Sequence, residues 1–263
     1  MIKDITLGQY FPGTSPVHRL DPRIKIILTL LYIFALFTIK NFTGYILFAA
    51  FTTTNIYIST IPVKYVFKGL KPLLFIIILT AFVNMFMTGG VTLFTIGPLV
   101  ATYEGVEIAV MMVLRLLFLI IGTSLLTFTT SPILLTDGIE KLLNPFKRIG
   151  VPAHELAMMM TIALRFIPTL LEETSKIMKA QMARGADFES GNLIKRAQGL
   201  VPLLVPLFIS AFRRADELAI AMESRCYRGG DQRTRMKQLQ LSKVDYKAVA
   251  LFIILIAVLL SVR

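Results

Sequence analysis

Long apolar segments are the feature that most constrains how this chain can fold. A helix that crosses a bilayer needs about 20 mostly apolar residues, with roughly 17 to 25 as the usual range. Five segments reach or approach that length, namely residues 24–39, 45–61, 70–87, 107–128 and 246–262. A chain in lipid must satisfy its backbone hydrogen bonds internally, so each segment is expected to be helical. The sequence therefore predicts an all-α, polytopic membrane protein with about five transmembrane helices.

Composition supports lipid as part of the solvent and argues against a nucleic-acid binder. Of the 263 residues, 55% are hydrophobic and only 17% are charged, which is more apolar than an ordinary soluble domain. The net charge is +12, yet the lysines and arginines lie between apolar segments and not among interleaved aromatic residues. The single cysteine, Cys226, excludes an internal disulfide and a multi-cysteine metal site. We expect the protein to lie in a lipid bilayer and to bind protein partners, and we expect it to bind no nucleic acid and no metal.

The distribution of basic residues predicts the orientation, because short cytoplasmic loops are enriched in lysine and arginine. Basic residues precede the first segment and follow the second, at Lys3, Arg19, Arg23, Lys25, Lys64, Lys68 and Lys71. One opposite connection holds only Lys40, and residues 88–106 hold no basic residue. The N-terminus is therefore expected in the cytoplasm. We predict a membrane domain of four transmembrane helices at 1–129, a cytoplasmic helical domain at 130–245 and a last transmembrane helix at 246–263.

The region between the fourth and fifth apolar segments is too polar to span a membrane as a whole and too apolar for a solvated linker. Ser131 and Pro132 are suited to the N-cap and first position of an amphipathic helix, which Pro145 would end or bend. A second helix is expected from about His154 to Arg184, with a bend near Pro168. A third is expected over residues 193–228. We predict that Gly185 ends the second helix and the glycine pair at 229–230 ends the third.

Two of these expected helices end in similar ways. One closes on Ala183, Arg184 and Gly185, and the other on Ser224, Arg225 and Cys226. A single arginine here would be explained by the helix dipole, which favours a cation at the C-terminus. Two such arginines on successive helices favour a paired docking device instead, because the guanidinium offers a planar fork that matches a carboxylate.

Several sequence blocks around these ends closely resemble the transmembrane, or T, component of energy-coupling factor transporters. The blocks are TTSP at 129–132, HELA at 154–157, LRFIP at 164–168, ARGADF at 183–188, VPL at 201–203, RRADELA at 213–219 and YRGG at 227–230. The family hallmark is a pair of Ala-Arg-Gly motifs on long coupling helices. The first is intact at Ala183, Arg184 and Gly185. The second reads Ser224-Arg225-Cys226, which keeps the arginine and replaces its alanine and glycine.

The resemblance implies a non-catalytic subunit of an ABC-type importer in the plasma membrane of a prokaryote. Such proteins join two cytoplasmic ABC-type ATPase subunits to a separate membrane-embedded substrate-binding S component, for uptake of vitamins or other micronutrients. Each motif arginine would meet an acidic residue in a groove of one ATPase, and the apolar face of the cytoplasmic helices would seat the S component. ATP and magnesium would be bound by the ATPases, with no cofactor on this chain.

Two other classes of function, a stand-alone permease and a membrane-embedded enzyme, would require different residues. A stand-alone permease would need charged or broken-helix features at mid-membrane, for which the sequence offers Arg115 and Asn84. Arg115 could instead reach the membrane surface or pair with Glu104 or Glu107. A membrane-embedded enzyme would need grouped acidic or histidine residues on the apolar segments, which hold almost none. No segment fits the phosphate-binding loop pattern, and the two histidines, far apart in sequence, favour surface or capping roles.

Overall fold

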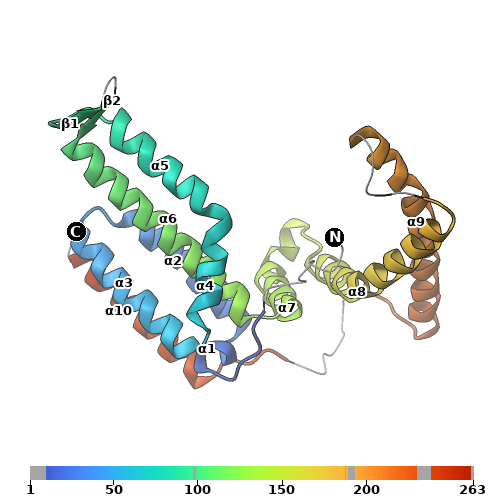
Figure 1. The fold of residues 1–263 in the computed structure, drawn as a ribbon. Coiled ribbons are helices and arrows are strands. Elements are labelled where there is room, and N and C mark those ends of the chain that lie inside the picture. The colour runs from blue at the N-terminus through green and yellow to red at the C-terminus, as the bar shows by residue number, and fades with distance from the viewer. Residues whose placement is uncertain (1–9, 97–98, 187, 189–192, 230–237, 262–263) are drawn as a thin grey trace. The chain divides into compact units, whose positions relative to one another are not determined.

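The computed structural model describes residues 10–96, 99–186, 188, 193–229 and 238–261, and these are mostly helical, as predicted (Figure 1). They form two compact units. The bundle unit comprises Gly8–Gly138 and Gln238–Arg263, and the paired-helix unit comprises Ile139–Lys237. The domain boundaries expected from the sequence remain a prediction.

The bundle unit is built from helices that pack lengthwise around a small aromatic core. Its elements are α1 (Pro16–Arg19), α2 (Pro22–Thr38), α3 (Phe42–Ser59), α4 (Val63–Leu70), the 3-10 turn Lys71–Leu73, α5 (Leu74–Met87), β1 (Thr92–Ile96), β2 (Leu99–Thr102), α6 (Tyr103–Thr129) and α10 (Lys243–Ser261). Tyr32, Leu36, Tyr45, Phe48 and Phe252 form the buried core between α2, α3 and α10, and side chains of α6 pack against it. Large apolar side chains elsewhere are exposed, as expected for a surface that faces lipid.

Four described helices are long and apolar enough to cross a membrane: Val63–Met87, α6, α8 (Ala153–Ala183) and α10. Three of them coincide with predicted transmembrane segments. The other two predicted segments correspond to α2, which has only 17 residues, and α3, whose 18 residues include the polar stretch Thr52–Asn55. The count of five spans, the cytoplasmic placement of α8 and the orientation of the chain therefore stay predictions.

The all-α expectation was wrong in one place, because residues between α5 and α6 form an antiparallel hairpin. Strands β1 and β2 pair Thr92 with Thr102 and Ile96 with Leu99. The segment is rich in threonine, valine, isoleucine and phenylalanine, whose side chains suit a strand, and Gly97-Pro98 separates the two strands in sequence. These residue types are the sequence signal for the hairpin.

Helices α2 and α6 run antiparallel and are joined at both ends of α2. At its start, the buried Lys25 ammonium donates to the Thr129 carbonyl at 2.9 Å and to Thr130 Oγ1 at 3.1 Å. At its end, Arg115 donates from a guanidinium nitrogen to the Ile39 carbonyl at 3.3 Å. Both cations thus sit at helix C-termini, where the helix dipole favours them. Residues 103–114 of α6 consequently extend past the end of α2, alongside α5 (Figure 1).

These contacts give Arg115 a structural role. Its guanidinium lies 5.5 Å from the ring centroid of Phe37, in cation–π geometry, besides its bond to Ile39. The predicted alternative of pairing with Glu104 or Glu107 is wrong among the described residues, since the Glu104 carboxylate accepts from the Val91 N–H at 2.8 Å. Arg115 therefore offers weak support for the permease hypothesis.

The start of α10 is fixed to the start of α2 by a buried carboxylate. Asp245 accepts from the backbone N–H groups of Ser242 and Asp21, both at 2.7 Å. Asp21 in turn caps α2 and pairs with Arg23 at 2.7 Å. Burial alone would raise the pKa of Asp21, but hydrogen bonds from the Arg23 side chain and backbone outweigh it and hold this pKa below its ordinary value. The start of α10, which follows the paired-helix unit in sequence, is thereby held against the start of α2 within the bundle unit.

The paired-helix unit consists of two long helices that cross. Helix α7 (Pro132–Leu143) begins in the bundle unit, with the Leu134 N–H bonded to the Ser131 hydroxyl as the predicted N-cap. A 3-10 turn (Asn144–Ile149) follows, then α8 and α9 (Leu193–Ser224). Where α8 and α9 cross (Figure 1), Glu173 accepts from Arg214 at 2.9 Å and from the Ser210 hydroxyl.

Candidate functional site

The first of the two predicted docking ends is a Schellman turn. The N–H of Gly185 bonds to the Met182 carbonyl, and the N–H of Ala186 bonds to the Gln181 carbonyl, both at 3.0 Å. Gly185 has φ of 88°, which is the left-handed conformation that this turn requires and that glycine adopts without strain. The prediction that Gly185 ends the helix is confirmed, and Arg184 occupies the C-cap position.

The second end has the same turn even though its glycine is replaced. The Cys226 N–H bonds to the Glu223 carbonyl at 2.8 Å, and the Tyr227 N–H bonds to the Met222 carbonyl at 3.0 Å. Cys226 has φ of 56°, so it occupies the position that Gly185 holds in the first turn. The predicted helix end near Arg228 was wrong: α9 ends at Ser224, because Cys226 already takes the left-handed conformation, three residues before Gly229, whose φ is 91°. Arg225 therefore matches Arg184 in backbone position.

All six predicted docking residues are exposed: Ala183, Arg184, Gly185, Ser224, Arg225 and Cys226. Within the part of the chain that the structure describes, neither Arg184 nor Arg225 has a side-chain hydrogen bond or an ion pair. A Cβ added at Gly185 would meet no atom within 4 Å. Both guanidinium groups are therefore available to a partner from solvent, each beside the negative end of a helix.

The two ends lie at opposite ends of the helix pair. Near the end of α8, the Gln181 amide donates to the Pro202 carbonyl of α9 at 3.4 Å. Near the start of α8, His154 and Met158 contact Tyr227, just after α9. The helices thus run in opposite directions. Arg184 follows Glu173 of α8 by about three helical turns, and Arg225 follows Arg214 of α9 by the same number. Each of these separations is roughly 16 Å along the helix axis.

A polar cluster that sequence reasoning missed lies beside the second end. His154 Nδ1 is 3.1 Å from a carboxylate oxygen of Glu140, and its Nε2 is 3.2 Å from the Tyr227 hydroxyl. That hydroxyl is also 3.1 Å from the sulfur of Met158. The expected surface or capping role of His154 was wrong, since the residue is partly buried and bridges three segments. Its partners are distant in sequence, so periodicity gave no signal for them.

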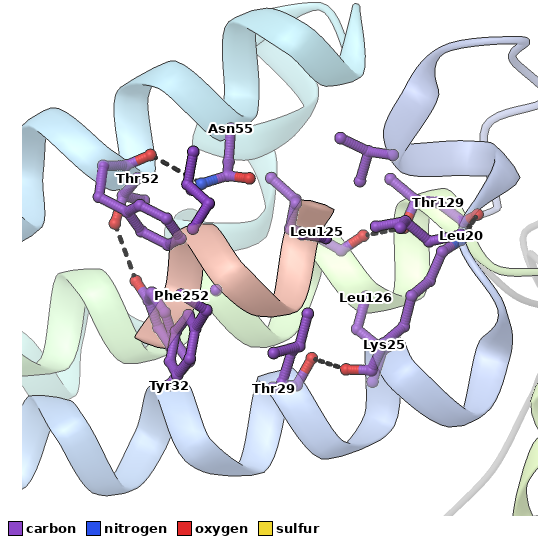
Figure 2. A pocket seen from close by; sticks show the side chains of 16 residues that line it. Leu20, Lys25, Thr29, Tyr32, Thr52, Asn55, Leu125, Leu126, Thr129 and Phe252 are labelled. Atoms are coloured by element: carbon purple, nitrogen blue, oxygen red, sulfur yellow. Dashed lines mark hydrogen bonds between the residues drawn. The ribbon is translucent and has the colours of Figure 1, made fainter. Parts of the chain in front are cut away.

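The bundle unit contains a cavity of about 130 Å³, lined mainly by apolar side chains of α2, α3, α6 and α10 (Figure 2). Lys25 is the charged residue in its lining, and its ammonium is bonded to Thr129, Thr130 and the His18 carbonyl. The lining therefore leaves no charged group free to hold an ionic solute. Within the described residues, no group of three His, Cys, Asp or Glu side chains is placed to hold a metal ion.

Comparison with known proteins assigns the chain to a family. Residues 13–236 match the family CbiQ, described as cobalt transport protein. The energy-coupling factor transporter transmembrane protein EcfT of Clostridium kluyveri is 62% identical over 260 residues, covering 98% of this chain and 96% of that protein. The protein of the same description from Bacillus subtilis is 47% identical over 264 residues, covering 100% of both chains.

A third relative from Thermosediminibacter oceani carries the same description and is 64% identical over 247 residues, or 94% of this chain and 93% of that protein. The similarity runs through the apolar helices as well as the paired helices, and thus extends well beyond the blocks around the two arginines. The chain belongs to the family of transmembrane components of energy-coupling factor transporters.

Proposed function

We propose that this protein is the coupling subunit of its transporter and that Arg184 and Arg225 each dock one ABC-type ATPase subunit. The observation that carries this proposal is the repeated geometry of the two ends. Both arginines occupy the C-cap of a Schellman turn, both are exposed, and they lie at opposite ends of one crossed helix pair. Simple helix capping explains one such arginine but gives no reason for two equivalent ones with free guanidinium groups.

The chemistry of the partner follows from the arginine side chain. A guanidinium donates two parallel hydrogen bonds to a carboxylate, so each end fits an acidic groove on an ATPase. The ATPases would bind ATP and magnesium in the cytoplasm, and closure of their nucleotide sites would draw the two ends together. The Glu173–Arg214 crossing would act as the pivot. This subunit would contribute no catalytic group.

An exposed apolar stripe on α9 supports a place for the third component. Val201, Leu204, Phe208 and Phe212 recur at helical spacing, and each side chain is about half exposed or more, from 47% for Leu204 to 69% for Phe212. An exposed apolar stripe of this kind marks a protein or membrane contact. We assign it to the membrane-embedded S component, which would carry the vitamin or other micronutrient and determine specificity.

Charge reversal of the two arginines tests the docking proposal. The wild-type protein and the Arg184→Glu, Arg225→Glu and double variants would be co-purified with the two ATPases, followed by ATP-driven uptake in vesicles. Loss of a charge-assisted pair is expected to weaken binding about tenfold or more for each arginine. Arg148→Glu, which reverses an exposed arginine outside both motifs, is the matched control. Full assembly of the double variant would reduce both arginines to helix caps and refute the proposal.

The single cysteine provides an independent test of where the ATPases bind. Cys226 is exposed and directly follows Arg225, so a docked ATPase should slow its reaction with a maleimide. The other end can be probed by Ala183→Cys in a Cys226→Ser background, since Ala183 is also exposed. We expect protection at both positions, and an unchanged labelling rate at either one would place the ATPase contact elsewhere.

A further inference from the structure

The two docking ends differ in how they are held. At the Arg225 end, Tyr227 closes the Schellman turn with its backbone N–H and places its hydroxyl 3.2 Å from His154 of α8. At the Arg184 end, residues 182–186 make no side-chain hydrogen bond in the described part of the chain. Two turns with the same backbone geometry therefore have different support.

The support at the Arg225 end continues through His154 to α7. The Glu140 carboxylate can only accept, so His154 donates from Nδ1 at 3.1 Å. On its other side, His154 Nε2 lies 3.2 Å from the Tyr227 hydroxyl, which also donates to the Met158 sulfur at 3.1 Å. Glu140, His154 and Tyr227 come from α7, α8 and the segment after α9, and all belong to the paired-helix unit. Because the ring is partly buried, its orientation is fixed by these partners.

We propose that His154 is a positioning residue that braces the Arg225 docking end through Tyr227, whereas the Arg184 end is more weakly held, by the long 3.4 Å bond from Gln181 to the Pro202 carbonyl of α9. This inference rests on the proposed function. A braced end pays less conformational entropy on binding than a free one. Removing the brace should therefore weaken docking at Arg225 by about five- to tenfold and leave docking at Arg184 unchanged. Movement of the Arg225 end would also be passed to α7 through Glu140.

The brace can be tested first on the isolated subunit, without any ATPase. A nitroxide spin label on the native Cys226 reports the mobility of the braced end, and the same label on Ala183→Cys in a Cys226→Ser background reports the other end. Tyr227→Phe, which removes only a hydroxyl, and His154→Ala are expected to raise the mobility at Cys226 and not at residue 183. Unchanged mobility at Cys226, or an equal rise at both positions, would overturn the brace.

The docking consequence is measured in two arginine backgrounds. In Arg184→Glu, where binding depends on the Arg225 end, Tyr227→Phe should weaken ATPase binding about five- to tenfold. In Arg225→Glu it should have no effect, which separates positioning from a general loss of structure. Equal effects in both backgrounds would overturn the inference and leave the two-arginine proposal standing. Failure of the wild-type protein to bind the ATPases would overturn both.

Discussion

The left-handed residues in the two Schellman turns allow a reciprocal pair of substitutions with opposite expected effects. Cys226 holds φ of 56° with a side chain, and Gly185 holds φ of 88° without one. A non-glycine residue in this conformation costs about 1–2 kcal/mol. Glycine in its place increases the conformational freedom of the unfolded chain, which offsets about 0.4–1 kcal/mol of the stability gained. Cys226→Gly should therefore stabilise the end of α9 by about 0.7 kcal/mol, and Gly185→Ala should destabilise the end of α8 by a similar amount.

Side-chain packing does not complicate this comparison. Cys226 is exposed, and a Cβ at Gly185 would meet no atom within 4 Å, so the backbone conformation dominates both changes. The assay is hydrogen exchange of the amides that close the turns, Tyr227 and Ala186, whose acceptors are Met222 and Gln181. A change of about 0.7 kcal/mol corresponds to roughly threefold in the exchange rate, slower at Tyr227 and faster at Ala186. Exchange unaltered at both amides, or changed in the same direction, would refute the strain argument.

Two further predictions concern the bundle unit. Gly122→Ala should destabilise the protein by about 1–3 kcal/mol, because its new Cβ would overlap the ring of Tyr32, which is held by hydrogen bonds. The measurement is thermal unfolding. Gly69→Ala is the control, because its new Cβ would lie 3.6 Å from the nearest atom. Burial lowers the pKa of His18 below 6.5. The hydrogen bond to the Phe11 carbonyl raises this pKa, but by less than burial lowers it. The folded state thus favours the neutral ring, so this stabilisation is present above pH 6.5 and is lost as the pH falls towards the lower folded pKa. The melting temperature of wild type should fall more between pH 7.5 and 5.5 than that of His18→Gln, and parallel profiles would contradict the assignment.

Local signals in the sequence predicted most of the helices, but the sequence did not predict the contacts between residues far apart in the chain. Ser131 and Gly185 act through neighbours within a few residues, so their capping roles could be read directly. The end of α9 was missed because a cysteine took a conformation that glycine usually adopts. His154 was missed because its partners, Glu140 and Tyr227, lie on other segments of the chain.

The same distinction explains Arg115. Its sequence context shows an arginine within an apolar segment, which is compatible with a solute path or with packing. Its bond to Ile39 exists only because α2 is short enough to end beside the middle of α6. The two motif arginines were identified from sequence, but their equivalent turns required backbone angles, and their opposite placement required the antiparallel contacts at Pro202 and Tyr227.

The unequal lengths of α2 and α6 have a consequence for the surrounding lipid. The 17 residues of α2 extend about 26 Å and the 27 residues of α6 about 40 Å, compared with a hydrocarbon thickness of about 30 Å. If α2 crosses the bilayer as the sequence predicts, lipids beside it would have to compress or tilt to match its shorter apolar length, while those beside α5 and α6 would not. The annulus of lipid around this protein would then be uneven, with shorter or more disordered acyl chains favoured on the side of α2.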